Sequence, residues 1–371
     1  MSTGSQSKAA KLPHLRRARL AKGEPVSLPL FMSSTFHLPG DPEGFSDYGR
    51  YCNSTWDAVE EMLGHLEDAS VVTFPSGMAA ISAVLFSQLR RGDRILIPAD
   101  GYHTTRTVAD RFLRKVDITI DTRPVGSFLL GGFDRYRLVL IETPSNPMLD
   151  ICDIQAVAAS AHAAGALVVA DNTMMTPYGQ RPLDLGADIV VAADTKAPNG
   201  HSDILFGHVA SRQADIASAV RDWRELTGCI PGPFEAWMVY RGLETLEVRF
   251  DRMCKTAEQV AVRLKEHPRV RDVRYPGLRD HPGHDLAARQ MERFGFLIGF
   301  TLESERQAEQ LINTCPLIQP ATSFGAIHTS AERRARWGDA VDPGFVRLSI
   351  GCEPTSELVT ALMTALDRAD G

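Results

Sequence analysis

The 371-residue sequence lacks several features that would each indicate a particular class of protein. No stretch is apolar for long enough to cross a bilayer, and the basic, polar residues 1–25 have no apolar core of the kind that a secretory signal needs. The six cysteines are scattered with no C-x-x-C pair, which disfavours a zinc cage or a disulfide framework. A net charge of −6 provides no broad basic surface for nucleic acid. We therefore expect a cytoplasmic protein with reduced thiols and without a metal site. We also expect it to bind neither membranes nor nucleic acid.

The sequence does contain ample material for a folded core. Its hydrophobic fraction of 44% and charged fraction of 23% are typical of a globular protein. The length exceeds the usual size of a single core, which favours one large and one smaller domain. Residues 1–55 hold several prolines and serines without helical periodicity, so we expect an extended N-terminal arm that contributes to a neighbouring subunit.

Short apolar runs alternate with helical patterns after the arm, which predicts a mostly parallel sheet flanked by helices. Thr55 is the expected cap of the first helix. The predicted strands are 94–98, 137–141, 167–170 and 189–192, and the predicted helices are 56–66, 78–89 and 154–164. These elements place an α/β domain at residues 56–245.

The sequence pattern changes after residue 200, and residues 235–253 predict one long helix that links two domains. The pattern beyond it predicts a smaller α+β domain at residues 246–371. Its expected strands are 270–275, 294–302 and 346–350, and its expected helices are 303–313 and 356–368.

Two ionisable residues stand at neighbouring strand ends in the stretch 167–201. Asp171 ends one apolar run, and Lys196 follows the next. In an open α/β sheet, ligands bind beside the carboxyl ends of the strands. A partly desolvated lysine can form a Schiff base and a buried aspartate can keep a pyridinium nitrogen protonated, so the pair fits pyridoxal phosphate. Alone, such an aspartate more often caps a turn, and such a lysine is usually solvated.

Two further segments could serve the same site. The run Ser76-Gly77-Met78 opens a helix directly after a strand, so its N–H groups and the helix dipole would suit a phosphate. A plain turn is the commoner outcome for such a run. Tyr102 follows the strand at 94–98, where its ring could stack on a planar cofactor and its hydroxyl could handle protons.

Asn146 and Arg347 are candidates for binding a substrate. The amide of Asn146 can donate to a phenolate or a carboxylate, although an Asn-Pro turn explains the residue equally simply. Arg347 lies inside an apolar strand and needs an anionic partner. That partner is either the carboxylate of a substrate or a structural salt bridge.

Eight segments together resemble the cysteine/methionine-metabolism family of pyridoxal-phosphate enzymes. The family includes cystathionine γ-lyase, cystathionine γ-synthase, cystathionine β-lyase and methionine γ-lyase, and the resemblance covers nearly the whole chain. The segments are YGRYCNST (48–55), FPSGMAA (74–80), ETPSNP (142–147), ADNT (170–173), QRPLDLGADIVVAADTK (180–196), NGHSD (199–203), RGLETLEVR (241–249) and VRLSIGCE (346–353). This resemblance implies the pyridoxal-phosphate transferase fold of type I.

The resemblance also implies roles for single residues. Lys196 would form the Schiff base with the cofactor and act with Tyr102 in catalysis. Asp171 would pair with the pyridine nitrogen, and Tyr102 would stack on the ring. The remaining cofactor contacts would come from Ser76, Gly77, Met78, Asn146 and Thr195, and from Tyr48 and Arg50 of the adjacent subunit. Asn146, Ser323 and Arg347 would hold the amino-acid substrate. A homodimer is then the smallest catalytic unit, and a homotetramer is the form usual in the family.

The chain departs from its relatives at three places near the expected site. Ala193-Asp194 stands where most relatives have Ser-Ala, and we expect Asp194 to point away, because a carboxylate facing a phosphate costs free energy. His103-Thr104 replaces Gly-Gly or Gly-Cys. His328 replaces a glutamate of the enzymes that handle cystathionine, so it either suits a smaller, neutral or anionic leaving group or is a surface residue.

The function that these features predict is a carbon–sulfur lyase for a small sulfur amino acid. We expect γ-elimination of the cystathionine γ-lyase type, which yields a thiol, a 2-oxo acid and ammonia. Replacement on O-acylhomoserine, as in cystathionine γ-synthase, is the nearest alternative, followed by methionine γ-lyase activity or β-elimination. A non-catalytic binding module of the same fold is an alternative of a different class, motivated by Ala193-Asp194.

Overall fold

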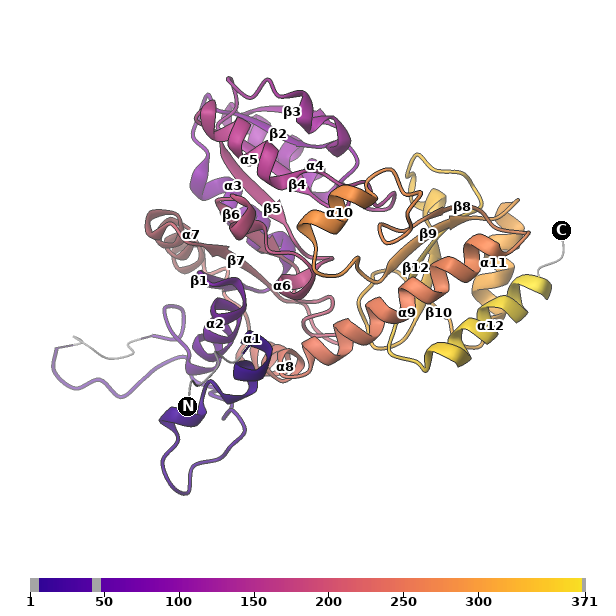
Figure 1. The fold of residues 1–371 in the computed structure, drawn as a ribbon. Coiled ribbons are helices and arrows are strands. Elements are labelled where there is room, and N and C mark those ends of the chain that lie inside the picture. Colours follow the sequence, from indigo (N-terminus) through magenta and orange to yellow (C-terminus); the bar gives the residue numbers. More distant parts are fainter. Residues whose placement is uncertain (1–6, 42–47, 369–371) are drawn as a thin grey trace, which may run out of the picture.

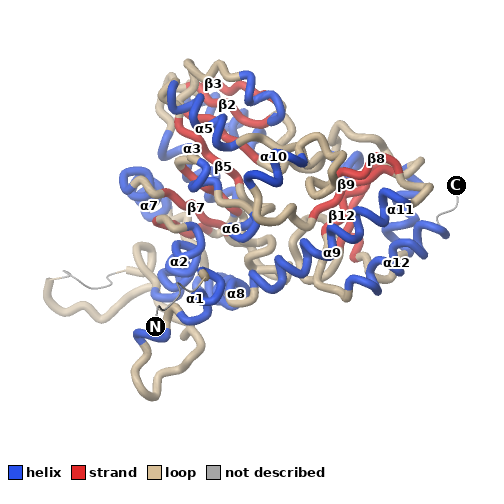
Figure 2. The backbone as a smooth tube through the Cα atoms, in the orientation of Figure 1, coloured by secondary structure: helices blue, strands red, loops and turns tan. Residues whose placement is uncertain are grey.

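The computed structural model describes residues 7–41 and 48–368, which fold around two separate β-sheets (Figure 1). Figure 2 shows the strands in two groups, with helices packed on each group. The larger sheet has seven strands and the smaller has five. An α/β architecture with a second, smaller sheet is thus confirmed, whereas the domain limits at residues 55 and 245 stay predictions.

The larger sheet is parallel except for one strand. Its strands, in spatial order, are β1 (Ser70–Phe74), β7 (Gly207–Ser211), β6 (Ile189–Ala192), β5 (Leu167–Asp171), β4 (Leu138–Glu142), β2 (Arg94–Pro98) and β3 (Thr119–Arg123). Only β7 runs antiparallel to its two neighbours. The sequence did not predict β3 or β7.

Helices cover both faces of the larger sheet because its strands are apolar on both faces. In β4, Leu138 and Leu140 belong to the core under α3 and α7, whereas Val139 and Ile141 belong to the core under α5. Two apolar layers of this kind are what a parallel sheet requires. The helices of this part are α2 (Ser54–Glu67), α3 (Gly77–Gln88), α4 (His103–Val108), α5 (Ile154–Ala163), α6 (Thr176–Gly179), α7 (Ala214–Thr227) and α8 (Pro233–Leu243).

The smaller sheet is antiparallel apart from its edge pair β10–β11. Its spatial order is β10 (Gln319–Pro320), β11 (Ser330–Arg333), β12 (Phe345–Ser349), β9 (Leu297–Thr301) and β8 (Arg271–Arg274). The helices of this part are α9 (Leu246–Glu266), α10 (His284–Gln290), α11 (Glu305–Thr314) and α12 (Thr355–Arg368).

Three local predictions are wrong. Residues 235–253 form the end of α8 and the start of α9, because α8 packs on α2 while α9 runs on to the smaller sheet (Figure 1). The cap of α2 is Asn53, whose side chain accepts a hydrogen bond from the N–H of Thr55 at 2.9 Å. The described part of the arm contains short helical turns: α1 (Lys8–Lys11), η1 (Leu12–His14) and η2 (Arg17–Arg19). Its Leu12 and Leu28 side chains are buried in the main core, because apolar side chains in a surface segment gain free energy by packing inward.

The remaining short helical segments are η3 (Ala109–Leu113), η4 (Arg114–Val116), η5 (Val125–Leu130), η6 (Pro182–Leu185) and η7 (Arg334–Trp337). All six cysteines lie in the described part of the chain and are free thiols. Within residues 7–41 and 48–368, no helix combines the length and the apolar character needed to cross a membrane.

Candidate active site

A cavity of about 580 Å³ lies between the carboxyl ends of the parallel strands and the smaller sheet. The larger sheet contributes Glu142 from the end of β4 and Asp171 from the end of β5. The smaller sheet contributes Glu332 from β11 and Arg347 from β12. The position agrees with the general rule that ligands of open α/β sheets bind beside the carboxyl ends of the strands.

Lys196 reaches the cavity from the turn that follows β6. Its Nζ donates a hydrogen bond to Ser323 Oγ and lies 4.8 Å from the centre of the Phe324 ring. Burial, together with the charge of Arg347, lowers the pKa of Lys196 to about 8. About one tenth of this amine is therefore uncharged at pH 7, and the uncharged amine is the form that can attack a carbonyl carbon.

Arg249 of α9 holds the backbone beyond the lysine. Its guanidinium is 8% exposed and donates to the carbonyl oxygens of Ala197 at 2.7 Å and Pro198 at 3.0 Å. A planar guanidinium with several donors suits such a cluster of carbonyl groups. The helix that links the two sheets thus also fixes the turn that carries Lys196.

Asp171 and Glu142 lie side by side at the ends of β5 and β4, where they are paired in register. Asp171 Oδ1 accepts a hydrogen bond from the N–H of Thr173 at 3.0 Å. Burial is the main cause that raises the pKa of both carboxyl groups, and for Glu142 the neighbouring Asp171 raises it further. Two adjacent carboxyl groups of this kind favour a state in which at least one holds a proton or faces a cationic ligand.

The N-terminus of α3 forms another wall of the cavity. Ser76 caps this helix, its Oγ accepting a hydrogen bond from the N–H of Ala79 at 3.1 Å. Gly77 and Met78 line the cavity, and a Cβ atom on Gly77 would lie 2.5 Å from Ala193 Cβ. The close approach leaves room for glycine alone, and it brings to the cavity a helix N-terminus, which is a favourable position for an anion.

Thr195 lines the cavity beside this helix. Its hydroxyl donates to the carbonyl oxygen of Phe206 at 3.1 Å and lies 2.9 Å from the N–H of the same residue. These contacts connect the turn after β6 to the segment that enters β7. The Thr195 side chain therefore has a defined orientation.

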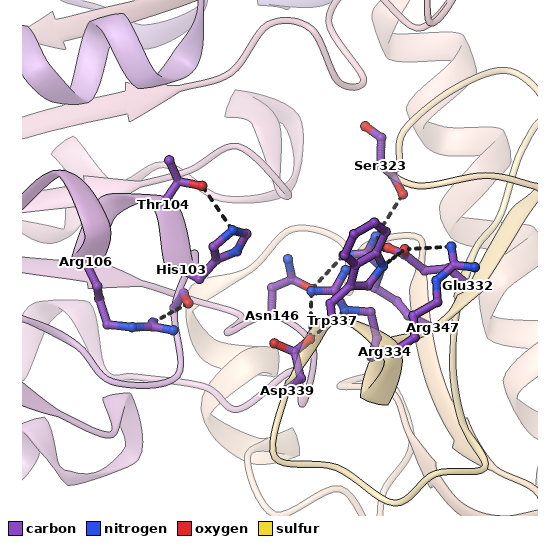
Figure 3. Close-up of polar contacts among 12 residues, drawn as sticks. His103, Thr104, Arg106, Asn146, Ser323, Glu332, Arg334, Trp337, Asp339 and Arg347 are labelled. Atoms are coloured by element: carbon purple, nitrogen blue, oxygen red, sulfur yellow. Dashed lines mark hydrogen bonds and ion pairs between the residues drawn. The ribbon is translucent and has the colours of Figure 1, made fainter. Parts of the chain in front are cut away.

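Tyr102 and His103 form the wall opposite the smaller sheet. The N–H of Tyr102 donates to Glu142 Oε2 at 2.7 Å, and the Tyr102 ring is 42% exposed in the single chain. The rings of Tyr102 and His103 meet edge to face with centroids 5.2 Å apart. Figure 3 shows His103 facing the side of the site that holds Asn146 and Trp337.

Arg347 is 3% exposed and has partners from both halves of the site. Its Nη1 donates to Asn146 Oδ1 at 2.8 Å, and its Nη2 donates to the Ser323 carbonyl oxygen at 3.0 Å. It also forms an ion pair with Glu332. Burial lowers the pKa of Arg347 to about 10, and the Glu332 carboxylate opposes that effect. The structural salt bridge considered from the sequence therefore exists, and the guanidinium nevertheless lines the cavity.

Sequence reasoning missed the polar cluster around Glu332 (Figure 3). This carboxylate accepts hydrogen bonds from Arg334 Nη1 and Trp337 Nε1, each at 2.8 Å, in addition to Arg347. Arg334 and Trp337 both line the cavity. A glutamate followed closely by three arginines and a tryptophan was the available signal, but its partner Arg347 lies in another strand. Glu142 was also missed, although it ends a strand just as Asp171 does.

Several residues singled out from the sequence lie outside the cavity of their own chain. Arg50 donates to the carbonyl oxygen of Glu225 at 2.7 Å and packs on the Tyr51 ring, and neither Arg50 nor Tyr48 lines the cavity. His328 is half-buried and also does not line it. Asp194 points away from the cavity, as expected, and contacts His208.

The residues present fit the groups of pyridoxal phosphate. An amine with a lowered pKa suits the aldehyde, a buried carboxyl group suits the pyridine nitrogen, and a helix N-terminus packed against Ala193 suits the phosphate. Together with the parallel sheet, this site defines the class of protein as a cofactor-dependent α/β enzyme.

The chain belongs to the Cys/Met metabolism family of PLP-dependent enzymes, whose model matches residues 14–367. It is 47% identical to the "Putative cystathionine gamma-lyase" of Streptomyces coelicolor, over 98% of this chain and 96% of that protein. The cystathionine gamma-synthase of Xanthomonas oryzae pv. oryzae, solved in complex with cystathionine, superposes with a TM-score of 0.94 at 34% identity, over 98% of this chain and 99% of that one. The methionine gamma-lyase of Micromonospora echinospora superposes with a TM-score of 0.91 at 34% identity, over 97% and 99%.

These relationships establish the cofactor and the class of chemistry. The protein is a pyridoxal-phosphate enzyme of the family that acts on sulfur amino acids. Its relatives include both lyases and synthases, so kinship leaves open which reaction this chain catalyses.

Proposed function

We propose that this enzyme cleaves the C–S bond of a sulfur amino acid by γ-elimination and releases a thiol, a 2-oxo acid and ammonia. The observation that carries the proposal is the way Ser323 joins Lys196 to Arg347. Its hydroxyl accepts from the lysine and its carbonyl oxygen accepts from the arginine. A substrate whose carboxylate pairs with Arg347 would thus have its α- and β-carbons beside the one amine that can move their protons.

The cofactor would be held by residues that already share the cavity. Lys196 would bind it covalently, Asp171 would pair with its pyridine nitrogen, and Tyr102 would stack on its ring. Its phosphate would be bound by Gly77, Met78 and Thr195, with Ser76 as the helix cap and Asn146 as a further cofactor contact. When bound, pyridoxal phosphate supplies an electron sink that stabilises negative charge at the α-carbon of the substrate.

The residues of the chain would then divide the remaining tasks. Arg347 would bind the substrate carboxylate, with Asn146 and Ser323 orienting it. Lys196, displaced by the substrate amine, would remove the α-proton, return it to the bound substrate and cofactor, and then, uncharged again, take a β-proton. Tyr102, on the opposite wall, would donate a proton to the departing thiolate. Each proton thus has a named donor or acceptor.

Similarity to known proteins supports a lyase reaction and leaves one alternative reaction, replacement. The relative that is 47% identical is named as a putative cystathionine gamma-lyase. The structure with a TM-score of 0.94 is a cystathionine gamma-synthase, which favours replacement on an activated homoserine as the second candidate. The two reactions differ in whether a second nucleophile reaches the substrate after its leaving group has departed.

Supplying substrates one at a time would distinguish these reactions. Purified enzyme is given cystathionine, methionine, cysteine or O-acylhomoserine, each with and without an added thiol. We expect 2-oxobutyrate and ammonia without added thiol, because γ-elimination needs no second nucleophile. Pyruvate would indicate β-elimination instead. Product formation only in the presence of thiol would show that the lyase assignment is wrong.

The smallest catalytic unit in this proposal is a homodimer. Tyr48 and Arg50 lie outside the cavity of their own chain, which is compatible with a contact to the cofactor phosphate of a neighbouring subunit. A homotetramer of two such dimers and a cytoplasmic location belong to the same proposal. Light scattering of the purified protein and fractionation of the producing cells would test these two points.

A further inference from the structure

A row of three buried ionisable side chains lies behind the turn that carries Lys196. Asp194, His208 and Glu67 are each no more than 2% exposed. His208 Nδ1 lies 2.9 and 3.0 Å from the two carboxylate oxygens of Asp194, and His208 Nε2 lies 3.6 Å from Glu67 Oε1. The imidazole thus stands between two carboxyl groups in a region that water does not reach.

The row connects helix α2, strand β7 and the turn after β6. Glu67 is the last residue of α2, His208 belongs to β7, and Asp194 lies two residues beyond the end of β6. His208 is paired in register with Ala192 of β6 on one side and with Thr73 of β1 on the other. A side chain in this central position can therefore fix the position of the turn that follows β6.

The immediate neighbours of the row form the cofactor cavity. Ala193 and Thr195, which flank Asp194, line that cavity. Gly207, which precedes His208, packs so closely on the start of α3 that a Cβ atom there would lie 2.6 Å from the backbone nitrogen of Gly77. The row therefore lies directly behind both the anion-binding helix end and the lysine turn.

The charges of the row are mutually dependent. Burial alone would lower the pKa of His208, but Asp194 and Glu67 together raise it to about 10. A set of one imidazolium and two carboxylates has a net charge of −1. Removing one of the three groups leaves the other two buried without a full set of partners. Burial raises the pKa of Asp171, whereas hydrogen bonds from Thr173 and, after them, the charges of Lys196 and the His208 imidazolium favour its ionised form.

We infer that Asp194, held by His208 and backed by Glu67, is a positioning residue for the cofactor. It fixes the Ala193–Thr195 backbone so that the turn can receive the cofactor phosphate and present Lys196. Asp194 touches neither cofactor nor substrate in this role, since its carboxylate faces away from the cavity. The inference concerns the binding of the cofactor, so it holds whichever sulfur amino acid is the substrate.

The same strand provides a matched control. Asp188, just before β6, also pairs with a histidine, since its Oδ2 lies 2.9 Å from His162 Nε2. That pair is at the opposite end of the strand, and neither member lines the cavity. Asp188→Asn therefore removes a carboxylate–histidine contact, one with a more exposed histidine, at the end of the strand away from the lysine turn.

The test compares Asp194→Asn with Asp188→Asn. The measurements are the dissociation constant of pyridoxal phosphate, the pH dependence of the absorbance of the bound cofactor, and the melting temperature of the cofactor-free protein. We expect Asp194→Asn to weaken cofactor binding about tenfold or more, because a charge-assisted hydrogen bond is lost. We also expect it to shift the absorbance titration, and Asp188→Asn to leave both properties unchanged.

Equal losses of melting temperature in the two variants, with unchanged cofactor binding and titration, would show that Asp194 is merely structural and overturn the inference. If Asp194→Asn does not fold, His208→Gln and Glu67→Gln are measured in the same way, with the same two outcomes. None of these measurements uses a substrate, so their failure is distinct from a failure of the proposed lyase reaction.

An independent measurement addresses the cofactor-free protein. Histidine labelled with ¹³C at Cε1 allows the charge of His208 to be followed by NMR, with His208→Gln assigning its signal. We expect an imidazolium at pH 8 that becomes neutral on replacement of Asp194 by Asn. A neutral His208 at pH 8 in the unmodified protein would contradict the proposed row of charges.

Discussion

Lys196 donates a hydrogen bond to Ser323, a residue 127 positions further along the chain and on the other side of the cavity. The contact connects the turn after β6 to the segment between β10 and β11. The lysine that would bind the cofactor is therefore in direct contact with a residue that would bind the substrate.

Replacement of Lys196 by alanine should abolish turnover while leaving the fold intact. We expect kcat to fall by about 10²- to 10⁴-fold, because the variant lacks the amine that would move the substrate protons. Borohydride treatment followed by mass spectrometry should show covalently bound cofactor in the unmodified protein and in a control lysine variant, but not in Lys196→Ala. Lys255, which is exposed and pairs with Asp251, provides the control variant Lys255→Ala. Covalent cofactor in Lys196→Ala would refute the assignment.

The rate at which cofactor-free protein captures pyridoxal phosphate should depend on pH through Lys196. The pKa of this amine is lowered to about 8, so its uncharged fraction rises with pH below 8 and levels off above it. We expect the capture rate to follow that curve in stopped-flow absorbance. A small primary amine measured over the same pH series corrects for titration of the cofactor itself. A corrected rate that keeps rising to pH 10 would indicate an unperturbed lysine.

Arg347→Lys should weaken substrate binding more than it slows turnover. Lysine keeps the charge that Glu332 requires but lacks the planar fork that can bind a carboxylate through two hydrogen bonds. We expect KM to rise about 10- to 100-fold with retained cofactor absorbance. Arg333→Lys is the control, because Arg333 lies in the neighbouring strand and pairs with Glu305 and Glu309 instead. Unchanged kinetics in Arg347→Lys would remove this residue from the site.

Trp337 should influence which sulfur substituent the enzyme accepts. Its ring lines the cavity and is oriented by the 2.8 Å hydrogen bond from Nε1 to Glu332. We expect Trp337→Ala to lower kcat/KM for cystathionine about tenfold more than for methionine, because the longer substituent loses more apolar contact. Trp337→Phe keeps a ring and should largely preserve the ratio. Equal losses for both substrates would show that the ring does not discriminate between them.

Mixing two inactive variants should restore activity if the sites are shared between subunits. A dimer of one Arg50→Ala chain and one Lys196→Ala chain would contain one site with both residues intact. Random reassociation should therefore recover about one quarter of the unmodified activity in a steady-state assay. Each variant mixed with itself is the control. Recovery of no activity in mixed dimers whose formation is verified would place Arg50 and Lys196 in the same chain's site.

Local patterns predicted the central part of the fold because each element there depends on its own residues. The apolar runs that become β4, β5 and β6 are buried on both faces, so their sequences alone favour parallel strands. The break between α8 and α9 was not visible, because it falls at Glu244 and Thr245, which are neither glycine nor proline, whereas the nearby Gly242 lies within α8. What separates the helices is their packing, since α8 packs on helix α2 whereas α9 packs on the smaller sheet.

The candidate site divides in the same way. Asp171 and Lys196 could be placed by reasoning from the ends of two strands, since the carboxyl end of a parallel strand has a known position in such folds. Glu332 and Trp337 could not be placed in this way, because they form part of the site only together with Arg347, which lies in another strand of the smaller sheet. Pairings of this kind depend on how segments distant in sequence pack together.

The amino-acid sequence by itself determined the alternation of strands and helices, the family, and the two strand ends that carry Asp171 and Lys196. Only the tertiary structure decided what Asp194 does. The sequence required that its carboxylate avoid the phosphate, but its partners lie in α2 and β7, at Glu67 and His208. Periodicity reports which face of an element is apolar, whereas the stability of a buried charge depends on groups that meet it only in the folded chain.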